Sequence, residues 1–296
     1  MKSASAASLP RQESLRDDLL VLVKARLSLL VLMTTLIGFL LGFEGPMNWL
    51  LLASTLAGTA LCAGGAAALN QWWERELDGR MKRTRSRPLP AGRMLPRDAL
   101  IFGVVFSCAG ILLLGTMANV RAAFLAFATI AIYILLYTPM KRWSTLNTLV
   151  GAVPGALPPL IGWIAARGRY DLEGCLLFAV LWFWQMPHFL AIAWMYREDY
   201  ANAGCIMISG NDAGGAVTSR QALLYSLCLL LITLLPGIIG FNSPLYFFCA
   251  LLLGTAFSVF AMNFTICRTR NAARALFFFS IIYLPVLLGL LVATKH

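Results

Sequence analysis

The chain has 296 residues, of which 59% are apolar and only 12% are charged. A soluble domain carries about twice that share of charged residues, so the composition excludes an ordinary soluble protein and predicts an integral protein of the lipid bilayer. The formal net charge of +11 is typical of the basic residues that gather on the cytoplasmic side of membrane proteins. We therefore expect no nucleic-acid partner.

Residues 1–26 are predicted to form a cytoplasmic N-terminal tail that becomes a surface helix between Ser14 and Lys24. The tail lacks the short apolar core and small-residue cleavage site of a secretory signal. Its acids Glu13, Asp17 and Asp18 argue against a transit peptide despite its many Ser and Ala residues. These features favour a bacterial cell inner membrane over a mitochondrial one.

Residues 27–296 are predicted to form one all-α, multi-pass transmembrane domain. A helix needs about 20 apolar residues to cross a bilayer. Nine suitable runs occur, at 27–43, 49–69, 99–118, 122–139, 146–166, 174–196, 221–241, 245–266 and 275–293. Because nine is odd, the two termini are expected on opposite faces of the membrane.

The distribution of basic residues predicts the orientation. With the N-terminus in the cytoplasm, only four of the 24 Lys and Arg residues fall on the other face, namely Arg121, Arg167, Arg169 and Lys295. The excess of basic residues on the cytoplasmic side sets the topology of membrane proteins. The N-terminus is therefore predicted to be cytoplasmic.

Two long connections, at about 70–98 and 197–220, follow the second and sixth spans and are both predicted to be cytoplasmic. Each begins with acidic residues at a helix end. Because the two loops lie four spans apart in the chain, we predict a bundle built from two four-helix halves, as in membrane proteins with internal repeats. Such a repeat would bring the two loops to face each other at one end of the bundle.

The first long connection carries Asn70, Glu74 and Asp78, which are spaced i, i+4, i+8 and so lie on one face of a helix. They extend over about 12 Å. One Mg²⁺ holds its oxygen ligands at about 2.1 Å, so the spacing suits more than one ion, or one ion and a water-mediated contact, along a diphosphate. The alternative is ordinary interfacial polarity, in which these acids pair with the nearby bases Arg75, Arg80 and Lys82.

Basic residues follow these acids at once, and Lys82, Arg83 and Arg87 are candidates to bind a diphosphate. The alternative is that they serve only the membrane topology. The same two interpretations apply to Lys141, which follows the fourth span.

The second long connection offers Asp199 as a further metal ligand. Its neighbours Arg197 and Tyr200 could reach phosphate oxygens. Asn70, Glu74, Asp78 and Asp199 are therefore the predicted metal ligands and catalytic residues.

His188 lies inside the sixth span, about 16 Å along the helix from Asp199. A polar residue at that depth faces the bundle interior and needs a partner. It is either a hydrogen-bonded structural histidine or an axial ligand or contact for haem, since neutral imidazole binds iron. The fifth span contains three prolines between Gly151 and Gly162, which predict a kinked or locally broken helix beside a cavity.

The pattern Asn70-x-x-x-Glu74-x-x-x-Asp78, followed by the segment Met81 to Arg93, resembles the first acidic motif of the UbiA-type intramembrane prenyltransferases. Further segments resemble the branch of this family that farnesylates protohaem: Tyr137 to Arg142, Asn147 to Pro159, Trp184 to Phe189 and Tyr196 to Gly204. The resemblance extends over nearly the whole chain after about residue 20.

The resemblance implies transfer of farnesyl from farnesyl diphosphate to a vinyl group of protohaem IX (haem b), giving haem o and diphosphate. It implies Mg²⁺ as cofactor, and a downstream haem a synthase or terminal oxidase assembly as partner. Two residues depart from the pattern of the superfamily: Glu74 replaces Asp, and Ala203 stands where a second acid of the later motif is usual. These departures leave the number of metal ions open.

Two alternatives remain. The acceptor could be an aromatic or quinone precursor, which would keep the same class of enzyme. A transporter of an anionic, lipid-linked substrate would be a different class, but it should carry charged residues in the middle of its spans. Here the spans are almost free of acids and bases.

Overall fold

The computed structural model describes residues 14–295, and every regular element in that part is a helix. Nine of its helical segments are long and apolar enough to cross a membrane, as the sequence predicts. They are α2 (Ala25–Gly42), α3 (Trp49–Arg80), α4 (Pro96–Met117), the segment Val120–Met140, α7 (Asn147–Arg167), α8 (Leu172–Met195), α10 (Ala216–Ile238), α11 (Pro244–Cys267) and α12 (Arg270–Ala293).

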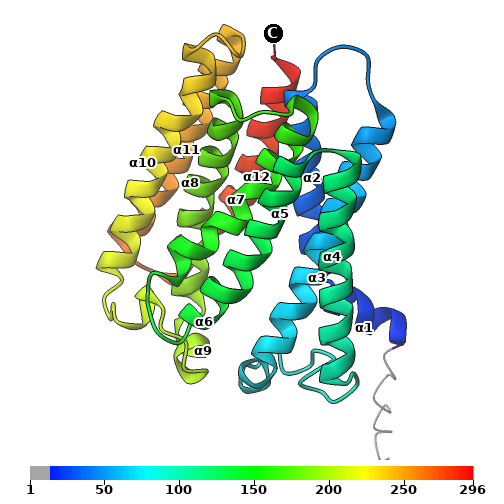
Figure 1. Ribbon diagram of the computed structural model, residues 1–296. Helices are drawn as coiled ribbons and strands as arrows, with labels where there is room; N and C mark the ends of the chain where they lie inside the picture. The colour runs from blue at the N-terminus through cyan, green and yellow to red at the C-terminus, as the bar shows by residue number, and fades with distance from the viewer. Residues whose placement is uncertain (1–13, 296) are drawn as a thin grey trace, which may run out of the picture.

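The spans form one bundle in which consecutive helices pack side by side and α12 returns against α2 (Figure 1). Helix α7 lies in the middle, in contact with α2, α5 (Val120–Ala131) and α8. The C-terminus lies at the opposite end from α1 (Leu15–Leu22), α6 (Thr138–Met140) and α9 (Arg197–Asn202). The loops after α3 and α8 therefore share one end of the bundle, as predicted.

The surface helix expected between Ser14 and Lys24 is α1. Its first turn is closed by a capping box, in which the Ser14 hydroxyl accepts from the Asp17 backbone N–H and the Asp17 carboxylate accepts from the Ser14 backbone N–H. Asp18 accepts hydrogen bonds from the Arg93 guanidinium at 2.8 and 3.0 Å. The helix is thus attached to the loop after α3. The tail residues 1–13 lie outside the described part of the chain.

Helices α2 and α7 approach each other closely because both present glycine. A Cβ atom on Gly38 would overlap the carbonyl of Pro159, and one on Gly162 would overlap the carbonyl of Thr35. Small residues allow this kind of approach in membranes, where helix association depends on van der Waals packing. This contact joins the first span to the middle of the bundle.

The fifth span is predicted to be kinked or locally broken, and the second alternative is wrong, because α7 is one continuous helix from Asn147 to Arg167 with Pro154, Pro158 and Pro159 inside it. Most of its residues are buried by neighbouring helices. Those neighbours support a proline-containing helix that would be weak in isolation.

The fourth span contains a feature that the sequence did not predict. Between α5 and α6 the chain forms a π-helical segment, η1 (Ile132–Tyr137). The Thr138 hydroxyl donates to the Tyr133 carbonyl at 2.8 Å, across the widened turn. Such π segments occur frequently at functional sites, and this one faces the polar end of α3.

Candidate active site

Helix α3 is 32 residues long and extends beyond its apolar part, so that Asn70, Glu74 and Asp78 lie on one buried face. These residues are 1%, 5% and 1% exposed, whereas the Glu76 side chain between them is 72% exposed. Burying two carboxylates is unfavourable unless each is paired or hydrogen-bonded. The partners of these residues therefore define the site.

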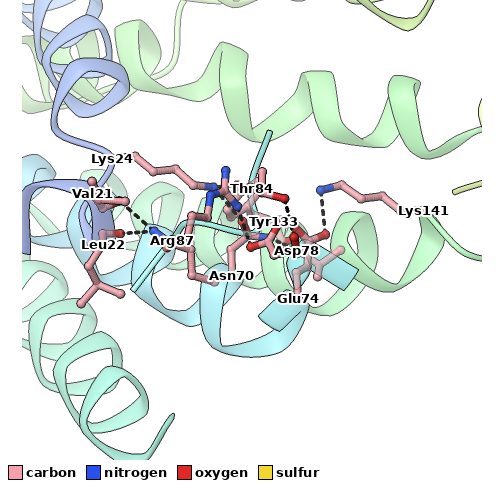
Figure 2. Close-up of polar contacts among 12 residues, drawn as sticks. Val21, Leu22, Lys24, Asn70, Glu74, Asp78, Thr84, Arg87, Tyr133 and Lys141 are labelled. Atoms are coloured by element: carbon pink, nitrogen blue, oxygen red, sulfur yellow. Dashed lines mark hydrogen bonds and ion pairs between the residues drawn. The ribbon is translucent and has the colours of Figure 1, made fainter. Parts of the chain in front are cut away.

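Each of the three residues is held by a cation from another segment (Figure 2). Lys24 Nζ donates to Asn70 Oδ1 at 2.7 Å, and Lys141 Nζ donates to Glu74 Oε1 at 2.7 Å. Arg87 Nη1 donates to Asp78 Oδ2 at 2.6 Å. The alternative in which the acids pair with the adjacent bases Arg75, Arg80 and Lys82 is therefore wrong.

Asp78 keeps one oxygen available for a ligand. Its Oδ1 atom is buried and has no hydrogen-bond partner among the residues that the structure describes. A buried carboxylate oxygen without a partner is costly, and hard cations prefer such oxygen ligands. This atom is therefore a carboxylate oxygen of α3 that is open to a metal ion or another ligand.

The two lysines of the site differ in environment. Burial, together with the positive charges of Arg87 and Lys141, lowers the pKa of Lys24 to about 7, and Glu74 partly opposes this shift. Burial also acts to lower the pKa of Lys141, but Tyr137 and then Glu74 outweigh it, and the net pKa is raised. Lys141 is thus a firmly charged group, whereas a charge on Lys24 is poorly compensated.

The π-helical segment η1 and Thr138, the first residue of α6, line one side of the site. Thr138 Oγ1 accepts from Asn70 Nδ2 at 3.1 Å, and the Tyr133 hydroxyl accepts from Lys24 at 3.2 Å. Lys141 lies 4.6 Å from the centre of the Tyr137 ring, a cation–π distance. Sequence reasoning missed Lys24, Tyr133 and Thr138 as site residues, because no local pattern reveals a π turn or a partner distant in sequence.

The second loop packs against the end of α3, as predicted. Leu77 and Met81 of the first loop region form a cluster with Ala203 and Cys205, and Tyr200 packs on it. The Ile206 backbone N–H donates to the Lys141 carbonyl at 2.8 Å. The end of α3, Lys141 and the second loop thus meet at one end of the bundle, although the last two lie about 60 and 120 residues after α3 in the chain.

Of the predicted residues of the second loop, Tyr200 packs at the end of α3, and no contact of Asp199 or Arg197 with the acids of α3 is found among the described residues. Asp199 is half-buried. Within residues 14–295, His, Cys, Asp and Glu side chains form no cluster of three or more that could hold one metal ion. Arg197 lies over the Trp194 ring at 4.4 Å and donates to the Trp194 carbonyl. Asp199 as a metal ligand and Arg197 as a phosphate contact stay predictions.

Two predicted bases of the first loop, Lys82 and Arg83, are exposed. Burial raises the pKa of the Tyr200 phenol, and the positive charge of Arg83 partly offsets that rise. Arg83 is therefore near the second loop. Of the three predicted bases of the first loop, Arg87 is the one that pairs with an acid of α3 in the described part of the chain.

His188 lies deeper in the bundle, between two aromatic rings. The Trp184 ring is stacked on one side at 5.2 Å and the Phe277 ring on the other at 4.8 Å. His188 Nδ1 is 2.7 Å from Ser280 Oγ, and Ser280 Oγ donates to the Phe277 carbonyl at 2.6 Å. Because a hydroxyl has one proton, this network assigns the proton to His188 Nδ1 and leaves the lone pair on Nε2.

Within residues 14–295, nine apolar spans form a bundle whose one end carries buried carboxylates, an amide and cations, which defines a multi-pass membrane protein with a charged site at that end. Residues 31–282 match the family model described as the UbiA prenyltransferase family. The chain belongs to this family of prenyltransferases.

Relatives with similar sequences cover nearly the whole chain. The protein named protoheme IX farnesyltransferase from Solibacter usitatus is 44% identical over 287 residues, covering 94% of this chain and 98% of the relative. The protein of the same name from Myxococcus xanthus is 42% identical over 292 residues, covering 98% of this chain and 97% of the relative.

Solved structures share the fold at low sequence identity. A structure concerned with digeranylgeranylglyceryl phosphate synthase superposes with a TM-score of 0.81 at 15% identity, covering 94% of this chain and 98% of that one. A UbiA homolog from Archaeoglobus fulgidus bound to GPP and Mg²⁺ superposes with a TM-score of 0.66 at 12% identity. This match covers 94% of this chain and 100% of that one. The predicted all-α, multi-pass fold is therefore confirmed, and the orientation of the N-terminus stays a prediction.

Proposed function

We propose that this protein transfers the farnesyl group of farnesyl diphosphate to a vinyl group of protohaem IX (haem b), releasing diphosphate and giving haem o. The observation that carries the proposal is the buried row of Asn70, Glu74 and Asp78, with each residue held by a different cation. The names of relatives at 37–44% identity support protohaem as the acceptor. His188, whose Nε2 atom carries the imidazole lone pair inside the bundle, is consistent with that choice.

The metal cofactor is proposed to be Mg²⁺, held by Asn70, Glu74, Asp78 and Asp199. The unpartnered Asp78 Oδ1 atom supports this assignment. A homolog of the same fold is bound to GPP and Mg²⁺. When bound, the metal would neutralise diphosphate charge and act as a Lewis acid.

The cations of the chain stabilise the charge that develops on the leaving diphosphate. Arg87 and Lys141 already lie at the acids. The exposed bases Lys82 and Arg83, together with Arg197 and Tyr200 of the second loop, complete the proposed diphosphate site.

The reaction breaks the C1–O bond of farnesyl diphosphate, the π bond of the vinyl group and one O–H bond of water, and it forms one C–C bond and one C–O bond. The C1–O bond of farnesyl diphosphate breaks, and its electron pair leaves with diphosphate. A vinyl carbon of haem b bonds to C1, and water then adds to the remaining cationic carbon and loses a proton, giving a hydroxyethylfarnesyl group. The apolar bundle limits earlier capture of the allylic cation by water.

The location proposed for this reaction is the bacterial cell inner membrane, with the diphosphate site on the cytoplasmic side. The apolar spans explain why the site lies in a bilayer, since both substrates are lipophilic. A haem a synthase or an assembling terminal oxidase is the proposed consumer of haem o.

The test is an assay of the purified protein with haem b, farnesyl diphosphate and Mg²⁺, with haem o measured by mass spectrometry. We expect EDTA to abolish the product and added Mg²⁺ to restore it. Asp78→Ala should lose turnover by about 100-fold or more yet remain folded. Glu76→Ala, which changes an exposed acid on the same helix, is the matched control. Near-normal haem o from Asp78→Ala would exclude that carboxylate from the mechanism.

A further inference from the structure

The junction between α1 and α2 places one lysine inside the site. Lys24 Nζ contacts Asn70 Oδ1 at 2.7 Å and the Tyr133 hydroxyl at 3.2 Å (Figure 2). Both of these partners are neutral. Arg87 and Lys141, by contrast, each form an ion pair with a carboxylate. Among these three cations, Lys24 is the one that can bind an anion without giving up a carboxylate partner.

The backbone at this junction is held in an unusual conformation. Lys24 has φ 48° and ψ 53°, in the left-handed region that non-glycine residues rarely adopt. Such strain persists only where the surroundings over-determine it, and it occurs often at functional sites.

Helix α3 supplies the contacts that hold the junction. The Gln71 side-chain amide donates to the carbonyls of Val21 and Leu22, at 2.9 and 2.7 Å. Leu22 is fully buried in a cluster with Ala68 of the same helix. Since Gln71 directly follows Asn70, one turn of α3 both fixes the end of α1 and receives the lysine.

Lys24 and Lys141 approach the acids of α3 from opposite sides (Figure 2). The row of Asn70, Glu74 and Asp78 thus has a basic side chain at each position, from the α1–α2 junction, from the end of the fourth span and from the loop after α3. An ammonium with only neutral partners gains most from a charged acceptor, because hydrogen bonds between ionised groups are the strong ones.

We propose that Lys24 is a diphosphate-binding residue, delivered by the α1–α2 junction, whose ammonium exchanges Asn70 for a phosphate oxygen of the prenyl diphosphate. This inference rests on the proposed function. The exchange frees the Asn70 amide oxygen at the same time. A haem propionate offers similar oxyanion chemistry, but the position of Lys24 beside the acids of α3 favours the diphosphate.

The experiment measures equilibrium binding to the full-length protein without turnover. The probe is farnesyl thiodiphosphate, whose C–S bond resists cleavage, with Mg²⁺ and without haem; inorganic pyrophosphate serves as competitor. We expect Lys24→Met to weaken both ligands about 10- to 100-fold and to leave haem b affinity unchanged in a separate titration. Lys24→Arg should keep most of the affinity.

Arg26→Met is the matched control, because Arg26 is an exposed base two residues away. It should bind the thiodiphosphate like the wild type. Lys24→Gln retains hydrogen bonding to Asn70 and Tyr133 without the charge, and it replaces Lys24→Met if that variant does not fold.

Three results would overturn the inference: unchanged diphosphate binding in the neutral variants, an equal loss in Arg26→Met, or a loss of haem affinity in place of diphosphate affinity. A wild-type protein that binds no thiodiphosphate would reject the proposed function as well. Wild-type binding with no effect of Lys24 would reject this inference alone.

Discussion

At the scale of single residues, the carboxylates of this site pair with bases that are not their neighbours in sequence, Asp78 with Arg87 and Glu74 with Lys141. Glu74 precedes Arg75, yet its ion pair is with Lys141. Adjacent residues on a helix point in different directions and do not face each other. Arg75 instead donates to the Trp72 carbonyl, lies over that ring and comes within 3.8 Å of the exposed Glu76 carboxylate, outside the buried site. A list of nearby opposite charges is therefore a poor guide to the pairs of a buried site.

His188 provides a prediction at the same scale. Its Nδ1 atom is assigned the proton by Ser280, which leaves Nε2 to bind iron or contact the haem. We expect His188→Ala to weaken haem b binding and to change the haem absorption spectrum, with farnesyl thiodiphosphate affinity retained. Ser280→Ala should weaken haem binding about tenfold, as is typical when the hydrogen bond that orients a ligand histidine is removed.

Absorption titrations with haem b measure both effects, and the thiodiphosphate titration provides the control. An unchanged haem spectrum and affinity in His188→Ala would assign this residue a structural role only, within the stack of Trp184 and Phe277.

At the scale of elements, the packing of α2 on α7 depends on glycine, because each helix places a backbone carbonyl where a side chain would be. Gly38→Ala should cost about 1–3 kcal/mol of stability, since the carbonyl of Pro159 belongs to a buried helix and cannot move aside cheaply. Thermal unfolding in detergent measures the loss.

Gly289→Ala on α12 is the matched control, because a Cβ atom there would meet open space. We expect its melting temperature to equal or slightly exceed that of the wild type, since Ala favours a helix. Equal melting temperatures for Gly38→Ala and the wild type would contradict the close approach of α2 and α7.

At the scale of the whole molecule, the orientation in the membrane is the main prediction. The loops after α3 and α8 lie at one end, and the C-terminus lies at the other (Figure 1). Because the basic residues are concentrated at the loop end, that end is expected in the cytoplasm. In a bacterial host, a fluorescent protein fused to the N-terminus should be fluorescent, and alkaline phosphatase fused to the C-terminus should be active. The reverse pattern would show the opposite orientation.

The sequence determined the number and place of the spans, since the thickness of the bilayer sets the length of an apolar helix. It also placed Asn70, Glu74 and Asp78 on one face, because helical periodicity is a local property. The convergence of the two acidic loops could be predicted from the four-helix separation, and the structure confirms it.

The tertiary structure alone decided which cation holds which acid, and it brought Lys24 into the site. It also formed the π-helical segment in which the Tyr133 hydroxyl accepts from Lys24, and it kept the proline-containing α7 continuous. These features depend on contacts between segments many residues apart. Local sequence patterns do not encode such contacts, since the free energy of burying a charge depends on every group packed around it.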